Sequence, residues 1–399
     1  MEVRSGMVLG DLRVQEMPRA GGGRSYAVLW PDGSVEQESE GFLQLFEGKG
    51  TQKTYAYYLV DHLRWRIREG LTTESVTMRD LHRYMGAVGA KVPMPYGQPW
   101  RVPPKRPYGT SALQVAAACL KGFYLHQCAE RGVNDEVRAA LEAQRLPTRA
   151  DRDRALLGHV KSSMAANPLA PRGGTRRRHP KMLPDGARPE LLRVLNTARD
   201  AMVVTWLADT SMRIGALCGL HLVDLHLRQD AACGECRPAH VHVCHRWGNP
   251  NRAAAKTKPD WRSADGTITG GEIFLASPAM ISSYFAYMTT EYAQHAAGHG
   301  MLLIQLEGSR RGEAWSTDGA RGMLRRAGRR AGLPGRIKPH AFRHTTTSQI
   351  LDASGNDPMV AKVAGNWASA RMVEDVYGHP DLHDPKFQAA LQTVWGEAE

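Results

Sequence analysis

The pentapeptide HAFRH, residues 340–344, combines side chains that could take part in acid–base and phosphate chemistry. His340 and Arg343 lie one helical turn apart, so on a helix both side chains project from the same face. An imidazole can exchange a proton near neutral pH, and a guanidinium can hold a phosphate or a carboxylate through two parallel hydrogen bonds. Further along, Tyr377 in the segment VYGHP adds a phenol to these groups. A solvated helix face without a ligand is the alternative, so the pair alone does not define a site.

A strong excess of positive charge favours a polyanionic partner. The 399-residue chain has a formal net charge of +12 and a pI near 9.5. Two basic segments, 171–181 and 319–338, contain no acidic residue. Clustered charge of this kind indicates binding to nucleic acid, in preference to the interpretation that the charge serves only solubility. The candidate DNA-binding residues are Arg176, Arg177, Arg178, Lys181, Lys258, Arg325 and Arg326.

Two groups of elements must position these side chains, and the first is a small helical domain at 46–145. Helical periodicity covers three stretches in it: 51–70, 75–88 and 111–132. Residues 1–45 are interpreted as an N-terminal appendage, in which 25–38 forms two short strands around the turn PDG. The charged stretch 146–181, punctuated by Gly and Pro, is interpreted as a basic linker.

Residues 182–399 are predicted to form a second, larger domain. Its predicted elements are a buried helix at 189–210, strands at 240–245 and 272–276, a helix at 281–294, and mainly helices from 316 onward. The expected fold class is mainly α with a small antiparallel β-sheet (α+β). The N-terminus carries charges where a signal peptide would be apolar, and the apolar runs are too short for a membrane span. A cytoplasmic, nucleoid-associated location is therefore expected.

Five short motifs occur in the order typical of the tyrosine recombinase, or phage integrase, family. They are TSMRIGALCGLHLVDL, a strand pair with a lysine between the strands, HAFRH, AGNW and VYGH. Residues from about 180 to 380 resemble the catalytic domain of that family, and the preceding helical unit is similar, more loosely, to its core-binding domain. The resemblance implies a helical core-binding domain followed by a tyrosine-recombinase catalytic domain.

Carried over position by position, the resemblance implies six catalytic side chains: Arg213, Lys256, His340, Arg343, Trp367 and Tyr377. The arginines correspond to the family's phosphate-binding pair, the histidine to its acid/base, the lysine to its general acid and the tyrosine to its nucleophile. Lys258 is an alternative to the preferred Lys256, and Asn366 is an alternative to the preferred Trp367. The family commonly has an acid where Ala216 stands, so weaker orientation of the neighbouring side chains is expected.

The resemblance implies a site-specific DNA recombinase, an integrase of a phage or mobile element. Tyr377 would attack a DNA phosphodiester and form a 3′-phosphotyrosine link that keeps the bond's energy, so neither ATP nor a metal is expected as cofactor. We expect two guanidinium groups to lower the pKa of the phenol below its usual value of about 10, and His340 to accept its proton.

The implied partners are double-stranded DNA and other copies of the chain. A homotetramer is expected on synapsed DNA and a monomer when the protein is free, with an accessory DNA-bending or directionality protein as a further candidate and no membrane. Type IB topoisomerases use the same residue types, although the separate helical unit and the short tail after Tyr377 argue against that function. A DNA-binding protein that has lost cleavage is supported only by Ala216 and by AGNW in place of the family's usual Gly-His pair.

Two further patterns remain open. The segment CGECRPAHVHVCH contains zinc-ligand residue types: Cys233, Cys236, His240, His242, Cys244 and His245. Its second half lacks a standard spacing, so a strand face without metal is the favoured interpretation, and a zinc ion there would be structural. Near the C-terminus, Phe387, Leu391 and Val394 form an apolar stripe that either packs on its own domain or docks on a neighbouring protomer.

Overall fold

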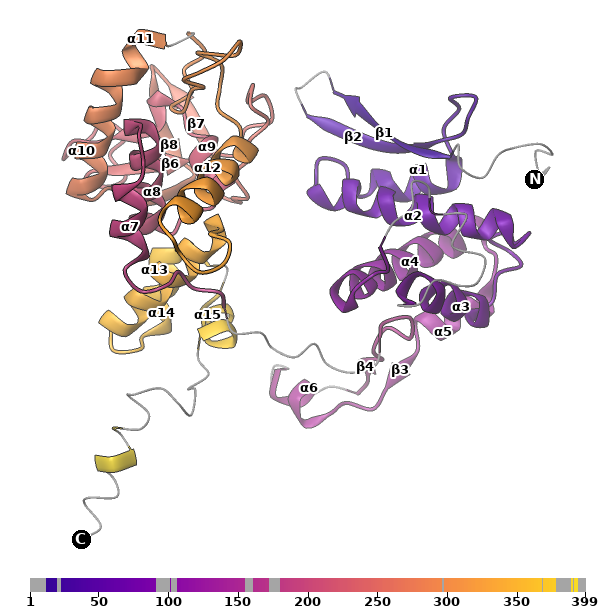
Figure 1. Ribbon diagram of the computed structural model, residues 1–399. Helices are drawn as coiled ribbons and strands as arrows, with labels where there is room; N and C mark the ends of the chain where they lie inside the picture. Colours follow the sequence, from indigo (N-terminus) through magenta and orange to yellow (C-terminus); the bar gives the residue numbers. More distant parts are fainter. Residues whose placement is uncertain are drawn as a thin grey trace. The chain divides into compact units, whose positions relative to one another are not determined.

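The computed structural model divides the chain into two compact units, Met1–Arg177 and Arg178–Glu399. It describes residues 12–19, 23–90, 101, 106–154, 161–171, 180–295, 298–367, 369–377, 389 and 391–393. Figure 1 shows the helices and strands of each unit. No helix in the described part of the chain has both the length and the apolar character that a membrane span requires.

Unit 1 places an antiparallel hairpin on a set of helices (Figure 1). In chain order, its elements are β1 (Arg13–Pro18), β2 (Arg24–Leu29), α1 (Gln37–Gln44), α2 (Gly50–Arg68), α3 (Met78–Gly89), α4 (Thr110–Arg131), α5 (Asp135–Leu141), β3 (Gln144–Arg145), α6 (Arg149–Arg154) and β4 (Ser163–Met164). The three helices predicted from periodicity are confirmed as α2, α3 and α4. Thr77 and Asp80 form a capping box at the start of α3, and Gly132 ends α4 with a left-handed backbone (φ 64°).

The N-terminal segment differs from its prediction in two ways. Strand β2 pairs with the upstream strand β1, and beyond the PDG turn only Val35 is bridged to Leu29. The reason is local, because the Glu36 side chain accepts hydrogen bonds from the first backbone N–H groups of α1 and so starts a helix where a strand was expected. Leu12 and Val28 are buried in the core of unit 1, so this segment is an integral part of the unit and not an appendage.

Much of the stretch predicted as a linker is also folded onto unit 1. Strands β3 and β4 pair with each other, and Leu169 is buried in the unit's core. The Asn167 amide donates a hydrogen bond of 2.8 Å to the carbonyl of Ala117 in α4. The predicted linker boundary at 146 is therefore wrong, and residues 172–179 lie outside the described part of the chain.

Unit 2 combines helices with two small antiparallel sheets, one of three strands in the order β5-β6-β9 and one of two, β7-β8. In chain order, its elements are α7 (Ala187–Arg193), α8 (Ala198–Thr210), α9 (Ile214–Cys218), η2 (Leu222–Asp224), β5 (Leu225–His226), β6 (His240–Val243), β7 (Trp261–Ala264), β8 (Thr267–Gly270), β9 (Glu272–Leu275), α10 (Pro278–Tyr287), η3 (Met288–Tyr292), α11 (Ala293–His295), α12 (Thr317–Arg330), α13 (Pro339–Ala353), α14 (Pro358–Gly365) and α15 (Ala370–Tyr377). The expected fold class, mainly α with small antiparallel sheets, is confirmed.

The helix predicted at 189–210 is interrupted. It forms two helices, α7 and α8, because Thr197 adopts an extended backbone and its side chain caps α8 by accepting a hydrogen bond from Asp200 N. Helix α8 is buried as expected, and its Trp206 donates a hydrogen bond of 3.1 Å to the carbonyl of Met280 in α10. Helix α8 also packs against α13, which carries the HAFRH motif.

Candidate active site

Helix α13 presents His340, Arg343, His344 and Thr347 at the spacing of successive turns on one side. Pro339 occupies the first turn, where its missing N–H costs no hydrogen bond, so the helix begins just before His340. The prediction that His340 and Arg343 share a helix is confirmed. Ring centroids of His340 and His344 are 4.4 Å apart, so the two imidazoles form a pair at this end of the helix.

Arg343 connects the ends of two other helices. It is only 1% exposed, and its guanidinium donates hydrogen bonds to Ser211 O (3.0 Å), after α8, and to Gly365 O (2.6 Å), at the end of α14. The guanidinium also lies 4.4 Å from the centroid of the Trp367 ring, a cation–π contact. Burial, followed by the nearby charge of Arg213, lowers the pKa of Arg343 to about 10, so the group remains a cation at neutral pH.

Two tight backbone features bring Arg213 and the Lys256 segment together. Ser211 ends α8 with a left-handed backbone (φ 56°), and Arg213 then forms the N-cap position of α9. At Gly215, a Cβ atom would lie 2.7 Å from the carbonyl oxygen of Ala254. Only glycine allows this approach, which holds the segment carrying Lys256 against the start of α9.

A strongly basic cleft of about 680 Å³ opens beside these elements. Its lining includes six cationic side chains and one imidazole: Arg213, Arg252, Lys256, Arg321, Arg336, Lys338 and His340. The lining contains no Asp or Glu. A cleft with one sign of charge concentrates anions.

Several of these residues were not singled out by the sequence. Arg321, Arg336 and Lys338 lie in the basic segment 319–338, whereas Arg252 has no local signal. Lys256 lines the cleft and Lys258 does not, although both side chains are exposed.

Tyr377 lies at the end of α15 and contacts the second histidine of the motif. Its hydroxyl is 2.8 Å from Nδ1 of His344, and its ring centroid is 6.0 Å from that of Trp367. The sequence had pointed to His340 as the proton acceptor. In the structure, His340 instead lines the cleft and interacts electrostatically with Arg213 and Arg343.

The direction of the Tyr377 pKa also differs from the expectation. Burial raises the pKa of the phenol above its ordinary value, and the opposing effects of the Thr347 hydroxyl and the Arg343 charge are smaller. The pKa of His344 is lowered to about 4, first by burial and then by the neighbouring His340 and Arg343. His344 is therefore neutral at pH 7, so one ring nitrogen is free to accept a hydrogen bond.

Buried donors without acceptors lie on Arg343 and on two residues at the end of α14, one of which, Trp367, has its ring near that of Tyr377. Nε of Arg343, Nε1 of Trp367 and Nδ2 of Asn366 are all buried, and none has a hydrogen-bond partner among the described residues. Unpaired buried N–H groups are costly and uncommon in folded proteins. These three N–H groups could donate hydrogen bonds to an anion with several acceptor oxygens. Trp367 and its alternative Asn366 both have a donor available for that purpose.

Glu272, at the start of β9, was missed by the sequence interpretation. Its carboxylate interacts electrostatically with both Arg213 and Arg343, while burial raises its pKa. Ala216 is 6% exposed and packs in the hydrophobic core of unit 2. Glu272 therefore supplies, from strand β9, a carboxylate that interacts with the two arginines, whereas Ala216 on helix α9 supplies none.

Of the candidate DNA-binding residues outside the cleft, the structure describes some and not others. Lys181, Arg325 and Arg326 are exposed, the last two on α12 beside a second hollow of about 610 Å³ that also has acidic side chains. Arg176, Arg177 and Arg178 lie outside the described residues, as do Phe387 and Val394 of the C-terminal stripe.

Comparisons with known proteins address the family and the fold of the chain. The model of the phage integrase family matches residues 277–383, which include HAFRH, AGNW and VYGH. No curated protein matches the chain. The solved structure of the Tn1549 transposon integrase in complex with transposon right end DNA is similar, with 12% identity, a TM-score of 0.55, and coverage of 89% of this chain and 98% of that chain.

A second similar structure is that of the XerH site-specific recombinase bound to palindromic difH substrate in a post-cleavage complex. It has 11% identity and a TM-score of 0.55, with coverage of 90% of this chain and 85% of that chain. The fold is that of the tyrosine recombinases. Residues 277–383 belong to the phage integrase family, and the resemblance stated from the motifs is confirmed.

Proposed function

We propose that this protein is a site-specific DNA recombinase that cuts and rejoins DNA strands through a covalent link to Tyr377. The observation that carries the proposal is the contact of the Tyr377 phenol with the neutral imidazole of His344, whose ring lies 4.4 Å from that of His340 in the lining of a basic cleft without carboxylates. The family assignment and the similar fold of the Tn1549 integrase and XerH, both described in complex with DNA, support DNA as the substrate.

In this mechanism the cationic groups bind the phosphate that is cut. Arg213 binds its non-bridging oxygens from the cleft, and Arg343 and Trp367 offer their unpaired N–H groups from the buried side. Guanidinium groups suit this task because they donate two parallel hydrogen bonds and stay charged. Glu272 orients the two arginines through their charges. Most of the rate enhancement then comes from positioning and charge stabilisation.

The first proton transfer follows the contact between Tyr377 and His344. As Tyr377 Oη bonds to phosphorus, its proton passes to Nδ1 of His344, at 2.8 Å. The bond from phosphorus to the 5′ oxygen breaks, and that oxygen takes a proton from Lys256 in the cleft. The products are a 3′-phosphotyrosine and a free 5′ hydroxyl, and rejoining reverses each transfer. The balance of the reaction requires neither ATP nor a metal ion.

The assembly and the biological task extend this proposal. Unit 1 serves as the core-type DNA-binding domain and unit 2 as the catalytic domain, with a homotetramer forming on two synapsed sites. Integration and excision of a phage or mobile element is the proposed task, in agreement with the integrase family that residues 277–383 match.

The test is a suicide substrate, a nicked duplex whose cleavage releases a short fragment and traps the covalent intermediate. It would carry candidate attachment DNA from beside the gene. We expect a protein–DNA adduct that resists denaturation and whose modified peptide contains Tyr377. Binding without an adduct would instead identify a DNA-binding protein that has lost cleavage. Relaxation of supercoiled DNA without any defined site would identify a topoisomerase.

A further inference from the structure

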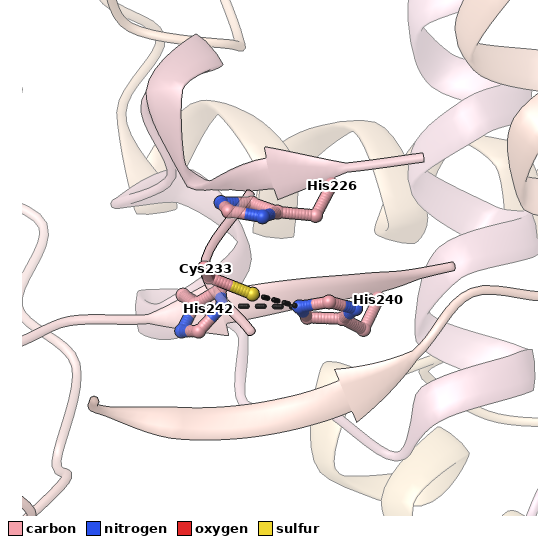
Figure 2. A group of neighbouring side chains, drawn as sticks. All are labelled: His226, Cys233, His240 and His242. Atoms are coloured by element: carbon pink, nitrogen blue, oxygen red, sulfur yellow. Dashed lines mark hydrogen bonds between the residues drawn. The ribbon is translucent and has the colours of Figure 1, made fainter. Parts of the chain in front are cut away.

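Three histidines and a cysteine converge beside the three-stranded sheet of unit 2, and none of them lines the basic cleft. Figure 2 shows His226 on β5, Cys233 in the following loop, and His240 and His242 on β6. One potential ligand atom from each of the four lies within 4.8 Å of those of the others. Cys233 Sγ is 3.2 Å from Nε2 of His240, which is 3.1 Å from Nε2 of His242.

The sheet explains why these side chains meet. His240 and His242 are two residues apart on β6, so both project from the same face. His226 is the direct cross-strand partner of His240 in the antiparallel pair β5–β6. The sequence pattern had included Cys233, His240 and His242, but it lacked His226, because strand pairing and not sequence proximity brings that residue in.

The hydrogen bonds of the two β6 histidines make this arrangement unfavourable without a ligand. Nδ1 of His240 lies 2.7 Å from Pro238 O, and Nδ1 of His242 lies 2.7 Å from Gly270 O. Because carbonyl oxygens only accept, each Nδ1 must carry a hydrogen. In the neutral rings both Nε2 atoms are therefore lone-pair acceptors, yet they face each other at 3.1 Å.

Both histidines are 0% exposed, so bulk water does not reach the space between the two Nε2 atoms. Glu235 Oε2 lies 4.0 Å from the other ring nitrogen of His242, Nδ1. A cation bound between the nitrogens would satisfy both lone pairs at once.

We propose that His226, Cys233, His240 and His242 bind a structural zinc ion. Three imidazole nitrogens and one thiolate are a ligand set that zinc takes in tetrahedral sites. With Zn–N bonds of about 2.0–2.1 Å and a Zn–S bond of about 2.3 Å, the tetrahedron has edges of about 3.3 Å between nitrogens and about 3.5 Å from nitrogen to sulfur. The observed 3.1 and 3.2 Å are within a few tenths of an ångström of these edges. The carbonyls that accept from both Nδ1 atoms fix the rings as such sites require.

The other potential ligands of the segment point elsewhere. Nδ1 of His245 lies 2.5 Å from Ala255 O, and Cys244 packs against Gly271. Cys236 is partly exposed and does not belong to the cluster. Cys236 is therefore a matched control for Cys233, since both are free thiols in the same loop.

The ion would fasten the loop between β5 and β6 to these two strands, and hydrogen bonds connect the cluster to the neighbouring hairpin β7–β8. Gly270, the last residue of β8, accepts from His242 and donates its N–H to Glu235 Oε1 at 2.8 Å. The cluster shares no residue with the lining of the basic cleft. Zinc here stabilises the domain and takes no part in the reaction.

The test measures metal in the full-length protein. After purification with zinc and removal of free ions, elemental analysis should find zinc equimolar with wild-type chain and with Cys236→Ser, but little with Cys233→Ser. The affinity for zinc should fall at least about 100-fold in Cys233→Ser, because a ligand bond is lost. The melting temperature of the chelator-treated wild type should rise with added zinc, since zinc binds the folded state.

Cobalt substitution tests the geometry without any variant, in case Cys233→Ser does not fold. Co²⁺ added to chelator-treated wild type should give the intense visible absorption of a tetrahedral site together with a thiolate charge-transfer band. A wild-type chain that takes up neither zinc nor cobalt would overturn the proposal. Loss of zinc in Cys236→Ser, or its full retention in Cys233→Ser, would also overturn it.

Discussion

The contact between Tyr377 and His344 leads to a specific prediction about proton transfer. Replacing His344 by Asn keeps an acceptor oxygen close to the position of Nδ1 but removes a group that can hold a proton. The matched comparison is His340→Asn, which changes the same residue type one turn earlier on α13, in the basic cleft. The two variants separate the imidazole that contacts Tyr377 in the structure from the one expected from the sequence to accept its proton.

The magnitude follows from the raised pKa of Tyr377 and the low pKa of His344. Burial raises the pKa of Tyr377 above 10, so a phenolate is rare at pH 7, whereas His344, with a pKa of about 4, is neutral there. General-base assistance accelerates a reaction by about 10²- to 10⁴-fold, and we expect a base as weak as His344 to contribute at the lower end of this range. We therefore expect His344→Asn to cleave about 10²-fold more slowly at pH 7, which corresponds to about 2.7 kcal/mol in the barrier.

The pH profile makes the test sharper. Wild-type cleavage should be nearly independent of pH from about 6 to 9, because His344 stays neutral throughout. Cleavage by His344→Asn depends on pre-formed phenolate, so its rate should rise about tenfold per pH unit and approach the wild-type rate near pH 9. The assay is single-turnover cleavage of the suicide substrate at saturating protein. A flat profile for His344→Asn, or a steep one for His340→Asn, would refute the assigned proton acceptor.

Three further predictions follow from the same site. Tyr377→Phe should abolish the covalent adduct while DNA affinity in a mobility-shift assay stays nearly unchanged, because only the attacking oxygen is lost; an adduct in this variant would assign another nucleophile. Lys256→Ala should slow single-turnover cleavage by about 10²-fold or more, and Lys258→Ala by less than about tenfold, since only Lys256 lines the cleft; equal effects would contradict this assignment. The pKa of His344 is lowered from 6.5 to about 4 by folding, so its contribution to stability is present above pH 6.5 and is lost as pH falls toward 4. Chemical denaturation at pH 7 and 4.5 should therefore show a smaller acid-induced loss for His344→Asn than for wild type, by about 1–2 kcal/mol after a discount for partial exposure, and an equal loss would contradict it.

Local patterns determined much of the secondary structure. The helices at 51–70, 75–88 and 111–132 followed from apolar periodicity and glycine stops, which depend only on nearby residues. The errors came where a short-range contact competed with that pattern. Glu36 and Thr197 each cap a helix, and these caps ended a predicted strand and divided a predicted helix.

For the site, the sequence by itself determined which residue types stand at each motif, and the motifs were enough to predict the family whose model matches residues 277–383. The tertiary structure decided which of them touch. It placed His344, not His340, against Tyr377, brought Glu272 to the two arginines, and added His226 to the cysteine–histidine cluster. These contacts depend on helix packing and strand pairing between distant segments, whose spacing along the chain gives no signal. Burial, which raises the pKa of Tyr377 although cations lie nearby, is likewise a property of the packed domain alone.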